Sequence, residues 1–204
     1  MSSSDGRGRI PIVGVMGSGK KVHGDLAKEL GVWIAQAGYN LLTGGGGGEM
    51  KAVSESFFNV EERAGRVIGI IPGDASGGSY SRRLHYPNEF VEIPIYTHLP
   101  QTGYEGMQVA SRNHVNILSS DIVVALPGTK GTAAEVCLAL RYGRPVIALL
   151  GGRFKIPGLP AEVQTVATVE EVAKWITELE PKPLPSSCRL KKVVPPDEIL
   201  TPDF

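Results

Sequence analysis

The chain has no excess of charge of either sign, because 21 Lys and Arg balance 21 Asp and Glu over 204 residues. Nucleic acids and anionic membranes attract proteins through basic surfaces, so this balance argues against both as the main partner. Cysteine is scarce as well, with two in the chain. Few cysteines are typical of a reducing compartment, and we therefore predict a cytoplasmic protein.

Long apolar runs are also absent, and no stretch reaches the roughly 20 apolar residues that cross a bilayer. The 4 histidines show no spacing typical of a metal site, so we expect none. Residues 1–9 lack the apolar core of a signal peptide, which predicts a flexible N-terminus. The remaining length is enough for one domain with a buried core.

Glycine and proline are plentiful, at 26 and 15 residues, and the glycines gather where strands are expected to end. Apolar strand-like runs alternate with segments of helical period. This alternation predicts an α/β fold, a Rossmann-like doubly wound parallel sheet in a single nucleotide-binding domain over 10–180. Ligands of such sheets bind at the carboxyl ends of the strands, near the reversal of strand order. Over 181–204 prolines recur without a period, which predicts an extended tail.

The individual elements follow from the same runs. Strands are expected at 10–16, 39–43, 66–71, 90–95, 121–126, 145–150 and 163–167, and helices at 23–36, 50–63, 104–118, 133–142 and 169–179. Segment 74–87 is expected to be a loop. Thr168 and Glu171 have the spacing of a capping box at the start of the last helix.

Three glycine turns follow expected strands, and we predict that they converge in space. The first, Gly14 to Lys21, fits the Gly-x-x-x-x-Gly-Lys start of a P-loop, but Lys21 stands where a magnesium-binding Ser or Thr belongs. A plain tight turn remains an alternative. We favour a turn that contacts phosphate or ribose through Gly17, Ser18 and Gly19.

The second turn follows Thr43 and holds five consecutive glycines. Glycine costs conformational entropy, so its repeated use indicates close approach of the backbone to a ligand or to a neighbouring loop. A mobile loop is the alternative. We predict that Thr43, Gly44 and Gly45 take part in binding.

The third turn, Pro127 to Glu135, joins a strand to a helix. The start of a helix has unpaired N–H groups and the positive end of the dipole, which together attract phosphate. The predicted phosphate-binding residues here are Gly128, Thr129, Lys130, Gly131 and Thr132. Glu135 has a plain alternative role, because Thr132 and Glu135 also have the spacing of a capping box.

Basic and aromatic residues gather in the irregular segment between the third and fifth expected strands. Arg82, Arg83 and His85 form a small basic cluster, for which a solvated loop is favoured over a cover for phosphate. Four tyrosines in the same region either form a stacking face for a flat ring of a ligand or pack on the surface: Tyr80, Tyr86, Tyr96 and Tyr104.

The third turn resembles the Pro-Gly-Gly-x-Gly-Thr-x-x-Glu signature of LOG-type proteins, the cytokinin-activating phosphoribohydrolases. Supporting segments stand in the same order at 14–19, 41–45 and 67–72, followed by Arg112. The resemblance implies that Arg112 and Glu135 are a catalytic pair. It also implies cleavage of the N-glycosidic bond of a nucleoside 5′-monophosphate by a homodimer or higher homo-oligomer, without a metal or organic cofactor.

By this resemblance, Glu135 stabilises positive charge on the sugar and Arg112 positions the phosphate or the leaving group. Two residues depart from the hydrolases: Thr129 replaces the second signature glycine, and Asn113, which we place among the binding residues, replaces a common lysine. Both departures look closer to a neighbouring branch that includes a molybdenum-cofactor carrier. On the signature as a whole we expect a hydrolase of small phosphorylated nucleotides. The alternative is a non-catalytic carrier or sensor of a phosphorylated pterin, the molybdenum cofactor, or of a nucleotide.

Overall fold

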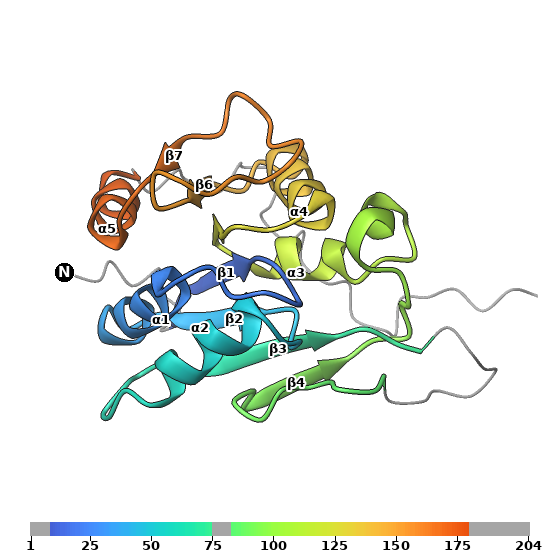
Figure 1. Cartoon of the computed structure of the whole chain (residues 1–204). Coiled ribbons are helices and arrows are strands. Elements are labelled where there is room, and N and C mark those ends of the chain that lie inside the picture. Colours follow the sequence, from blue (N-terminus) through green and yellow to red (C-terminus); the bar gives the residue numbers. More distant parts are fainter. Residues whose placement is uncertain (1–8, 75–82, 180–204) are drawn as a thin grey trace, which may run out of the picture.

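The computed structural model describes residues 9–74 and 83–179, which form one parallel sheet of seven strands with helices on both faces (Figure 1). The expected features at 1–8, 75–82 and 181–204 lie outside these residues. The order across the sheet is β4-β3-β2-β1-β5-β6-β7. The strands are β1 (Ile12–Met16), β2 (Asn40–Thr43), β3 (Val67–Ile71), β4 (Ile93–Tyr96), β5 (Ile122–Ala125), β6 (Val146–Leu149) and β7 (Thr165–Val166).

Five α-helices cover the sheet, and they divide between its two faces (Figure 1). Helices α1 (Leu26–Gln36), α2 (Glu49–Phe58) and α5 (Val169–Glu178) pack on one face. Helices α3 (Asn113–Ser119) and α4 (Lys130–Arg141) pack on the other. The prediction of a doubly wound α/β sheet is confirmed. Its strand order reverses between β1 and β5, which pair in parallel, so the ligand crevice of this fold class is expected at their carboxyl ends.

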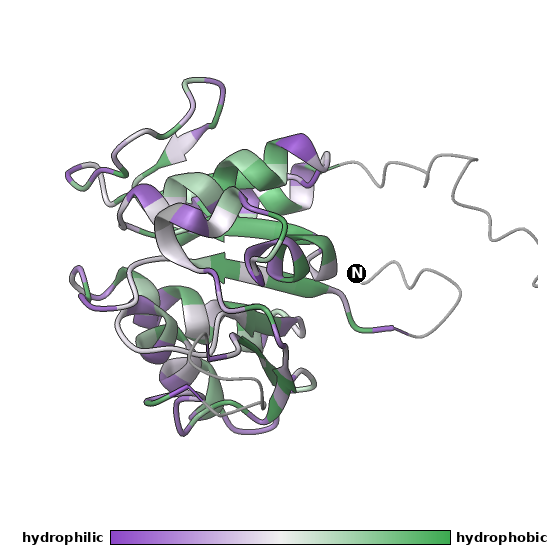
Figure 2. Ribbon diagram, turned by 90° about the vertical axis from the view of Figure 1, so that its right-hand side faces the viewer, coloured by the Kyte–Doolittle hydropathy of each residue, from purple (hydrophilic) through white to green (hydrophobic). Residues whose placement is uncertain are grey.

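Each central strand supplies both hydrophobic cores, because successive side chains point to opposite faces. Val124 of β5 packs in the core under α1, α2 and α5, whereas its neighbour Val123 packs in the core under α3 and α4. Figure 2 shows the strands as a nearly continuous hydrophobic layer, with hydrophilic residues on the outer faces of the helices. Burial on both sides explains why these strands read as continuous apolar runs.

The largest difference between the predicted and observed elements is in the segment that contains α3. The expected helix over 104–118 is wrong, because it divides into a short 3-10 helix, η1 (Gly103–Met107), and α3 (Asn113–Ser119). Gln108 between them has an extended backbone with ψ of 151°. A side chain at Gly106 would overlap the amide of Asn113, so the turn between the two helices requires close approach. Arg112 is therefore the N-cap residue of α3 and does not lie inside a longer helix.

Three other helices begin or end away from their expected limits. The first begins at Leu26, the second ends at Phe58, and α4 begins at Lys130, three residues before the expected Ala133. The last helix matches its expectation closely, and the capping box of Thr168 and Glu171 is confirmed.

Thr168→Ala is expected to lower the free energy of unfolding by about 1 kcal/mol, because the threonine oxygen accepts a hydrogen bond from the Glu171 backbone at 3.3 Å. Thr177→Ala is the matched control in the same helix. Its hydroxyl bonds back to backbone carbonyls already inside the helix, so its loss should be close to neutral. Urea unfolding measures both, and equal losses would contradict the capping assignment.

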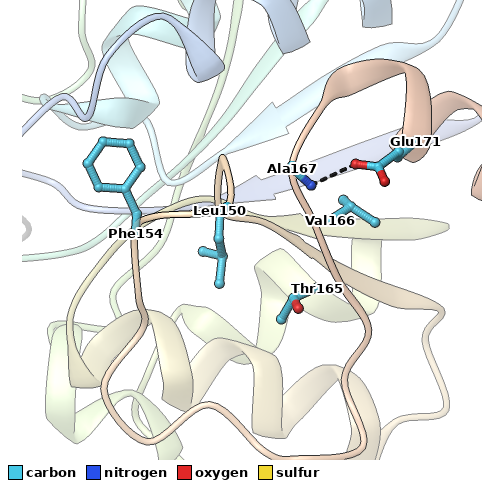
Figure 3. A pocket seen from close by; sticks show the side chains of 7 residues that line it. Leu150, Phe154, Thr165, Val166, Ala167 and Glu171 are labelled. Carbon is cyan, nitrogen blue, oxygen red and sulfur yellow. Dashed lines mark hydrogen bonds between the residues drawn. The ribbon is translucent and has the colours of Figure 1, made fainter.

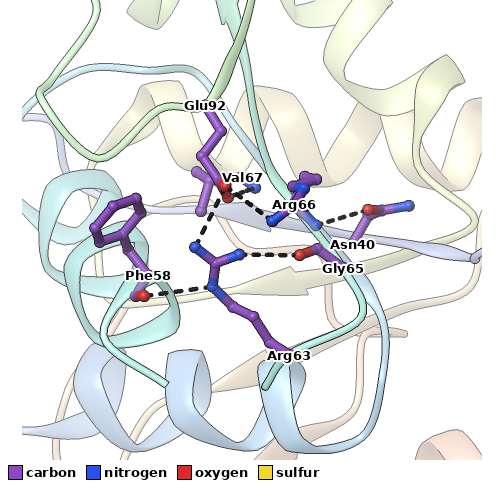
Figure 4. Close-up of polar contacts among 7 residues, drawn as sticks. All are labelled: Asn40, Phe58, Arg63, Gly65, Arg66, Val67 and Glu92. Carbon is purple, nitrogen blue, oxygen red and sulfur yellow. Dashed lines mark hydrogen bonds and ion pairs between the residues drawn. The ribbon is translucent and has the colours of Figure 1, made fainter. Parts of the chain in front are cut away.

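A polar cluster joins the amino ends of β2 and β3, opposite to the edge where ligands of this fold bind (Figure 4). Glu92 accepts a hydrogen bond from the Val67 backbone at 2.9 Å and lies within ion-pair distance of Arg63 and Arg66. The Arg66 backbone donates to Asn40 at 2.8 Å. These contacts fix the strands at the end away from the glycine turns, so the cluster has a structural role.

Candidate functional site

The three glycine turns meet at the carboxyl ends of β1, β2 and β5, as the sequence predicts. The backbone N–H of Ser18 in the first turn donates to Pro127 of the third turn at 3.2 Å. The Ser18 carbonyl accepts from Glu49, which follows the second turn, at 2.8 Å. The turns are therefore bonded to one another at the point where strand order reverses.

Arg112 and Glu135, the two residues predicted to be catalytic, are both buried beside these turns. Only 4% of the Arg112 surface and 9% of the Glu135 surface is exposed. Asn116 lies one helical turn beyond Arg112 in α3, and its amide donates to Glu135 at 3.4 Å. Helix α3 thus directs two polar residues toward α4.

Glu135 does not fold back onto the start of its own helix. The N-cap of α4 is Thr129, whose hydroxyl accepts from the Gly131 backbone at 3.3 Å. The capping-box interpretation of Thr132 and Glu135 is wrong, because the helix begins before Thr132 and Glu135 bonds to Asn116 instead. The Glu135 carboxyl group is instead part of a buried polar contact between α3 and α4.

The Arg112 guanidinium packs flat against the second turn and lacks its full set of acceptors. A side chain at Gly44 would overlap its terminal nitrogens, so glycine is required there for close approach. Nε and Nη1 of Arg112 are buried without a hydrogen-bond partner, and so is Oδ1 of Asn116. Nearly all buried polar groups in native proteins are hydrogen-bonded, so orphans concentrated in one place indicate a site for a ligand.

The segment after residue 82 brings further polar groups to Arg112. Burial lowers the pKa of Arg112, the charge of Glu135 and the charge and hydroxyl of Tyr86 act to raise it, and the positive charge of Arg83 lowers it further. Arg83 itself donates to neutral oxygens of Pro100 and Thr102 at 3.2 and 3.5 Å. Arg83 is thus partly exposed and lies within electrostatic range of the buried Arg112, whereas His85 is exposed and Arg82 lies outside the described residues.

Burial raises the pKa of Glu135 from 4.5 to about 7, against the opposing effects of the Arg112 charge and the Asn116 hydrogen bond. Close to neutral pH this carboxyl group is protonated in a large fraction of molecules. Within the described ranges, neither Arg83 nor Arg112 forms an ion pair with a carboxylate. The Arg112 charge beside a partly neutral acid, with Arg83 within electrostatic range of Arg112, leaves an excess of positive charge.

Glu135→Gln is expected to raise the free energy of unfolding at pH 8 by about 3 kcal/mol, and the gain should shrink as the pH falls toward 5. Between pH 4.5 and 7 the folded protein keeps a proton that the unfolded chain has released, so the stability due to Glu135 falls as the pH rises. Glutamine removes that penalty. Urea unfolding across this range tests the effect, with Glu29→Gln on the exposed surface of α1 as control. A gain that is constant with pH would contradict the raised pKa.

The other predicted binding residues do not all lie at one place. Gly17, Ser18, Gly19 and Gly44 lie where the turns contact one another or Arg112. In the third turn Gly128 packs on Thr132 and Gly131 on Gly103 of η1, whereas Thr129 and Lys130 are exposed. Thr43 and Gly45 support the second turn, because the Thr43 hydroxyl accepts from Gly45 at 3.0 Å and Gly45 accepts from Asn88 at 2.8 Å. The Asn113 side chain packs against Gly106 of η1.

Sequence reasoning missed Asn116, His23 and Glu49. The spacing of Asn116 from Arg112 is a detectable signal, since residues four apart share a helix face. His23 and Glu49 are far apart in sequence but bonded at 2.8 Å, and the sequence holds no local signal for that contact.

A pocket of about 320 Å³ lies along the same edge of the sheet, at the ends of β6 and β7 (Figure 3). Its acid, Glu171, accepts from the backbone N–H of Ala167 at 2.7 Å and from that of Thr168 at 3.0 Å, and the second bond belongs to the capping box. Neither Arg112 nor Glu135 lines this pocket. In the described part of the chain, no three His, Cys, Asp or Glu residues are placed to hold a metal ion, and no helix has the length and apolar character to cross a bilayer.

The fold and the site together define a Rossmann-like protein whose turns and buried arginine meet at the strand-order reversal. The chain belongs to the SLOG cluster4 family, which matches residues 10–179. This confirms the resemblance to LOG-type proteins noted in the sequence.

Solved structures of known proteins resemble this one over most of its length. A molybdenum cofactor binding protein from the phototrophic bacterium Rippkaea orientalis is 31% identical, with a TM-score of 0.62 over 83% of this chain and 96% of its own. The molybdenum cofactor carrier protein of Chlamydomonas reinhardtii is 32% identical, with a TM-score of 0.58 over 83% and 97%. An uncharacterised protein of Archaeoglobus fulgidus is 29% identical over 165 residues, which are 80% of this chain and 92% of that protein.

Proposed function

We propose that this protein binds a small phosphorylated ligand at the meeting point of the three turns and releases it unchanged. The ligand we propose is a phosphorylated pterin, the molybdenum cofactor. The observation that carries the proposal is the buried Arg112, which has two nitrogens without acceptors and lies against Gly44 of the second turn, within electrostatic range of Glu135 in α4. A phosphate group offers the acceptors that this guanidinium lacks.

The surroundings of Arg112 favour an anion over a neutral ligand. Arg83 adds a second positive charge, and burial keeps Glu135 partly neutral near pH 7. The positive end of the α4 dipole acts in the same direction. Phosphate therefore occupies the side of the site formed by Arg112 and α4, and Arg83 adds to its attraction.

Two features favour a carrier over a hydrolase. Asn113 stands where the hydrolases commonly have lysine, and its side chain packs on Gly106. Thr129 stands where they have glycine, and its hydroxyl occupies the Gly131 N–H that would otherwise be free for phosphate. Two similar solved structures are named for binding or carrying the molybdenum cofactor, which supports the same choice of ligand.

One observation favours hydrolysis of a nucleoside 5′-monophosphate as a second candidate. A carboxyl group with a pKa of about 7 is poised to donate a proton to a departing base and to take it back from water. Glu135 is such a group, and Arg112 beside it would hold the phosphate. In this candidate both residues are catalytic.

Incubation of the purified protein with the molybdenum cofactor, and separately with AMP and GMP, distinguishes the two candidates. The proposal predicts saturable binding of the cofactor, recovery of the intact ligand after denaturation, and no ribose 5-phosphate from either nucleotide. Arg112→Met should weaken the binding strongly. If the wild type releases free base and ribose 5-phosphate, and Glu135→Ala does not, the carrier proposal is wrong and the protein is a hydrolase.

A further inference from the structure

A second buried carboxylate lies at the same crevice and is not used by the phosphate side of the site. Glu49 is the first residue of α2, and only 1% of its surface is exposed. Its Oε1 accepts from both the backbone N–H and Nδ1 of His23, each at 2.8 Å. Its Oε2 is buried without any hydrogen-bond partner.

The Glu49 side chain crosses the end of β1 at the reversal of strand order. A Cβ atom added to Gly17 would lie 2.9 Å from the Cβ of Glu49 and 3.1 Å from the Cβ of Leu126, which follows β5. Any side chain at position 17 would therefore collide with Glu49 on one side and with Leu126 on the other, so Gly17 allows both to pack closely. The Glu49 side chain therefore begins at the crevice formed by β1 and β5, at the same sheet edge as Arg112, and its carboxyl group extends to His23.

His23 holds Glu49 from the side of the first turn. The His23 ring packs edge-on against Phe154 with the ring centroids 5.3 Å apart, which places it against the loop after β6. Burial raises the pKa of Glu49, and the contacts with His23 act to lower it. The two hydrogen bonds that His23 donates stabilise the carboxylate form of Glu49. Because both go to Oε1, Oε2 is the oxygen without a partner.

An ionised carboxylate only accepts hydrogen bonds, so the free oxygen selects an N–H or O–H donor and repels phosphate. It therefore suits the end of the ligand remote from the phosphate. Among the parts of a phosphorylated pterin or nucleotide, the amino group of a 2-amino-4-oxopyrimidine ring is such a donor, and pterin and guanine share this ring.

We propose that Glu49 recognises the 2-amino group of a pterin or guanine ring through Oε2, with His23 as its positioning residue. This inference rests on the proposed function, because it places the ring of the same ligand whose phosphate lies at Arg112. It makes Glu49 the residue that distinguishes ligands with this amino group from ligands without it.

Titration calorimetry with GMP, IMP and ribose 5-phosphate tests the proposal, because IMP lacks only the 2-amino group of GMP. The wild-type protein should prefer GMP to IMP by roughly tenfold, the size expected for a hydrogen bond to a charged group. In Glu49→Gln the amide oxygen must face the two His23 donors, which turns the amide nitrogen toward the ligand. The preference for GMP should then disappear, with affinity for IMP and ribose 5-phosphate changed by less than about twofold.

His23→Ala serves as a second variant, which keeps the carboxylate but removes its Nδ1 donor. It should reduce the preference for GMP in the same direction, whereas His23→Asn, which keeps a donor, should restore part of it. Equal affinity of the wild type for GMP and IMP, or an equal loss for all three ligands in Glu49→Gln, would overturn the proposal. Failure of the wild type to bind ribose 5-phosphate would instead overturn the proposed function, and this inference with it.

Discussion

Arg112→Met is expected to weaken the binding of a phosphate ester on the order of a hundredfold. Removing one partner of a buried, charge-assisted contact costs roughly 2–5 kcal/mol, and Arg112 is the buried cation of this site. Arg112→Lys should have an intermediate effect, because lysine keeps the charge but not the planar set of donors. Titration calorimetry with ribose 5-phosphate measures all three proteins.

The stability of Arg112→Met distinguishes a binding residue from a structural one. Without ligand, two nitrogens of this guanidinium are buried and unpaired, so the folded protein gains little from it. Methionine of similar length should leave the free energy of unfolding unchanged or slightly higher, since binding sites commonly trade stability for function. A large loss of stability with unchanged affinity would contradict the assignment.

Gly44→Ala is expected to weaken the same binding by roughly 30-fold or more without unfolding the protein, because a misplaced charge-assisted contact costs about as much as a lost one. The added Cβ would overlap the Arg112 guanidinium, which is the far end of a flexible side chain and is able to move. Gly44 does not have the positive φ that would strain alanine. The change therefore acts by displacing Arg112 from the second turn.

The double variant Gly44→Ala, Arg112→Met provides the control. If Gly44 acts only through Arg112, the glycine change should have no further effect on affinity once the arginine is gone. Additive losses would show that Gly44 contributes to binding independently of the guanidinium, and would contradict this account of the second turn.

The architecture could be predicted from the sequence because it depends on local period and on general rules for parallel sheets. Continuous apolar strands such as 121–126, followed by helical periods, leave few arrangements other than helices on both faces. The glycine turns follow strand ends, and parallel strands bring those ends to one edge. Their convergence was therefore predictable before any contact was known.

The details that the sequence did not predict depend on tertiary contacts. The expected helix over 104–118 has a helical period, but Gly103 and Gly106 pack closely on Gly131 and Asn113, and the helix is interrupted after Met107, where Gln108 is extended. The start of α4 was misplaced because Thr129 and Thr132 are both acceptable caps, and only the contact of Glu135 with α3 decides between them.

Contacts between polar residues far apart in the sequence could not be predicted for the same reason. Arg83 and Arg112 are brought together by the course of the chain between β3 and α3, and His23 and Glu49 by the packing of the first turn on α2. Neither pair has a spacing that marks it in the sequence. Sequence patterns therefore located the crevice but not the full set of charges within it.

A crystal structure with a bound phosphate ester tests the central claim most directly. The account predicts that the phosphorus atom lies at the first turn of α4, with its oxygens within hydrogen-bond distance of Arg112. A phosphate bound elsewhere, for example in the pocket at the ends of β6 and β7, with Arg112 still unpaired, would contradict it.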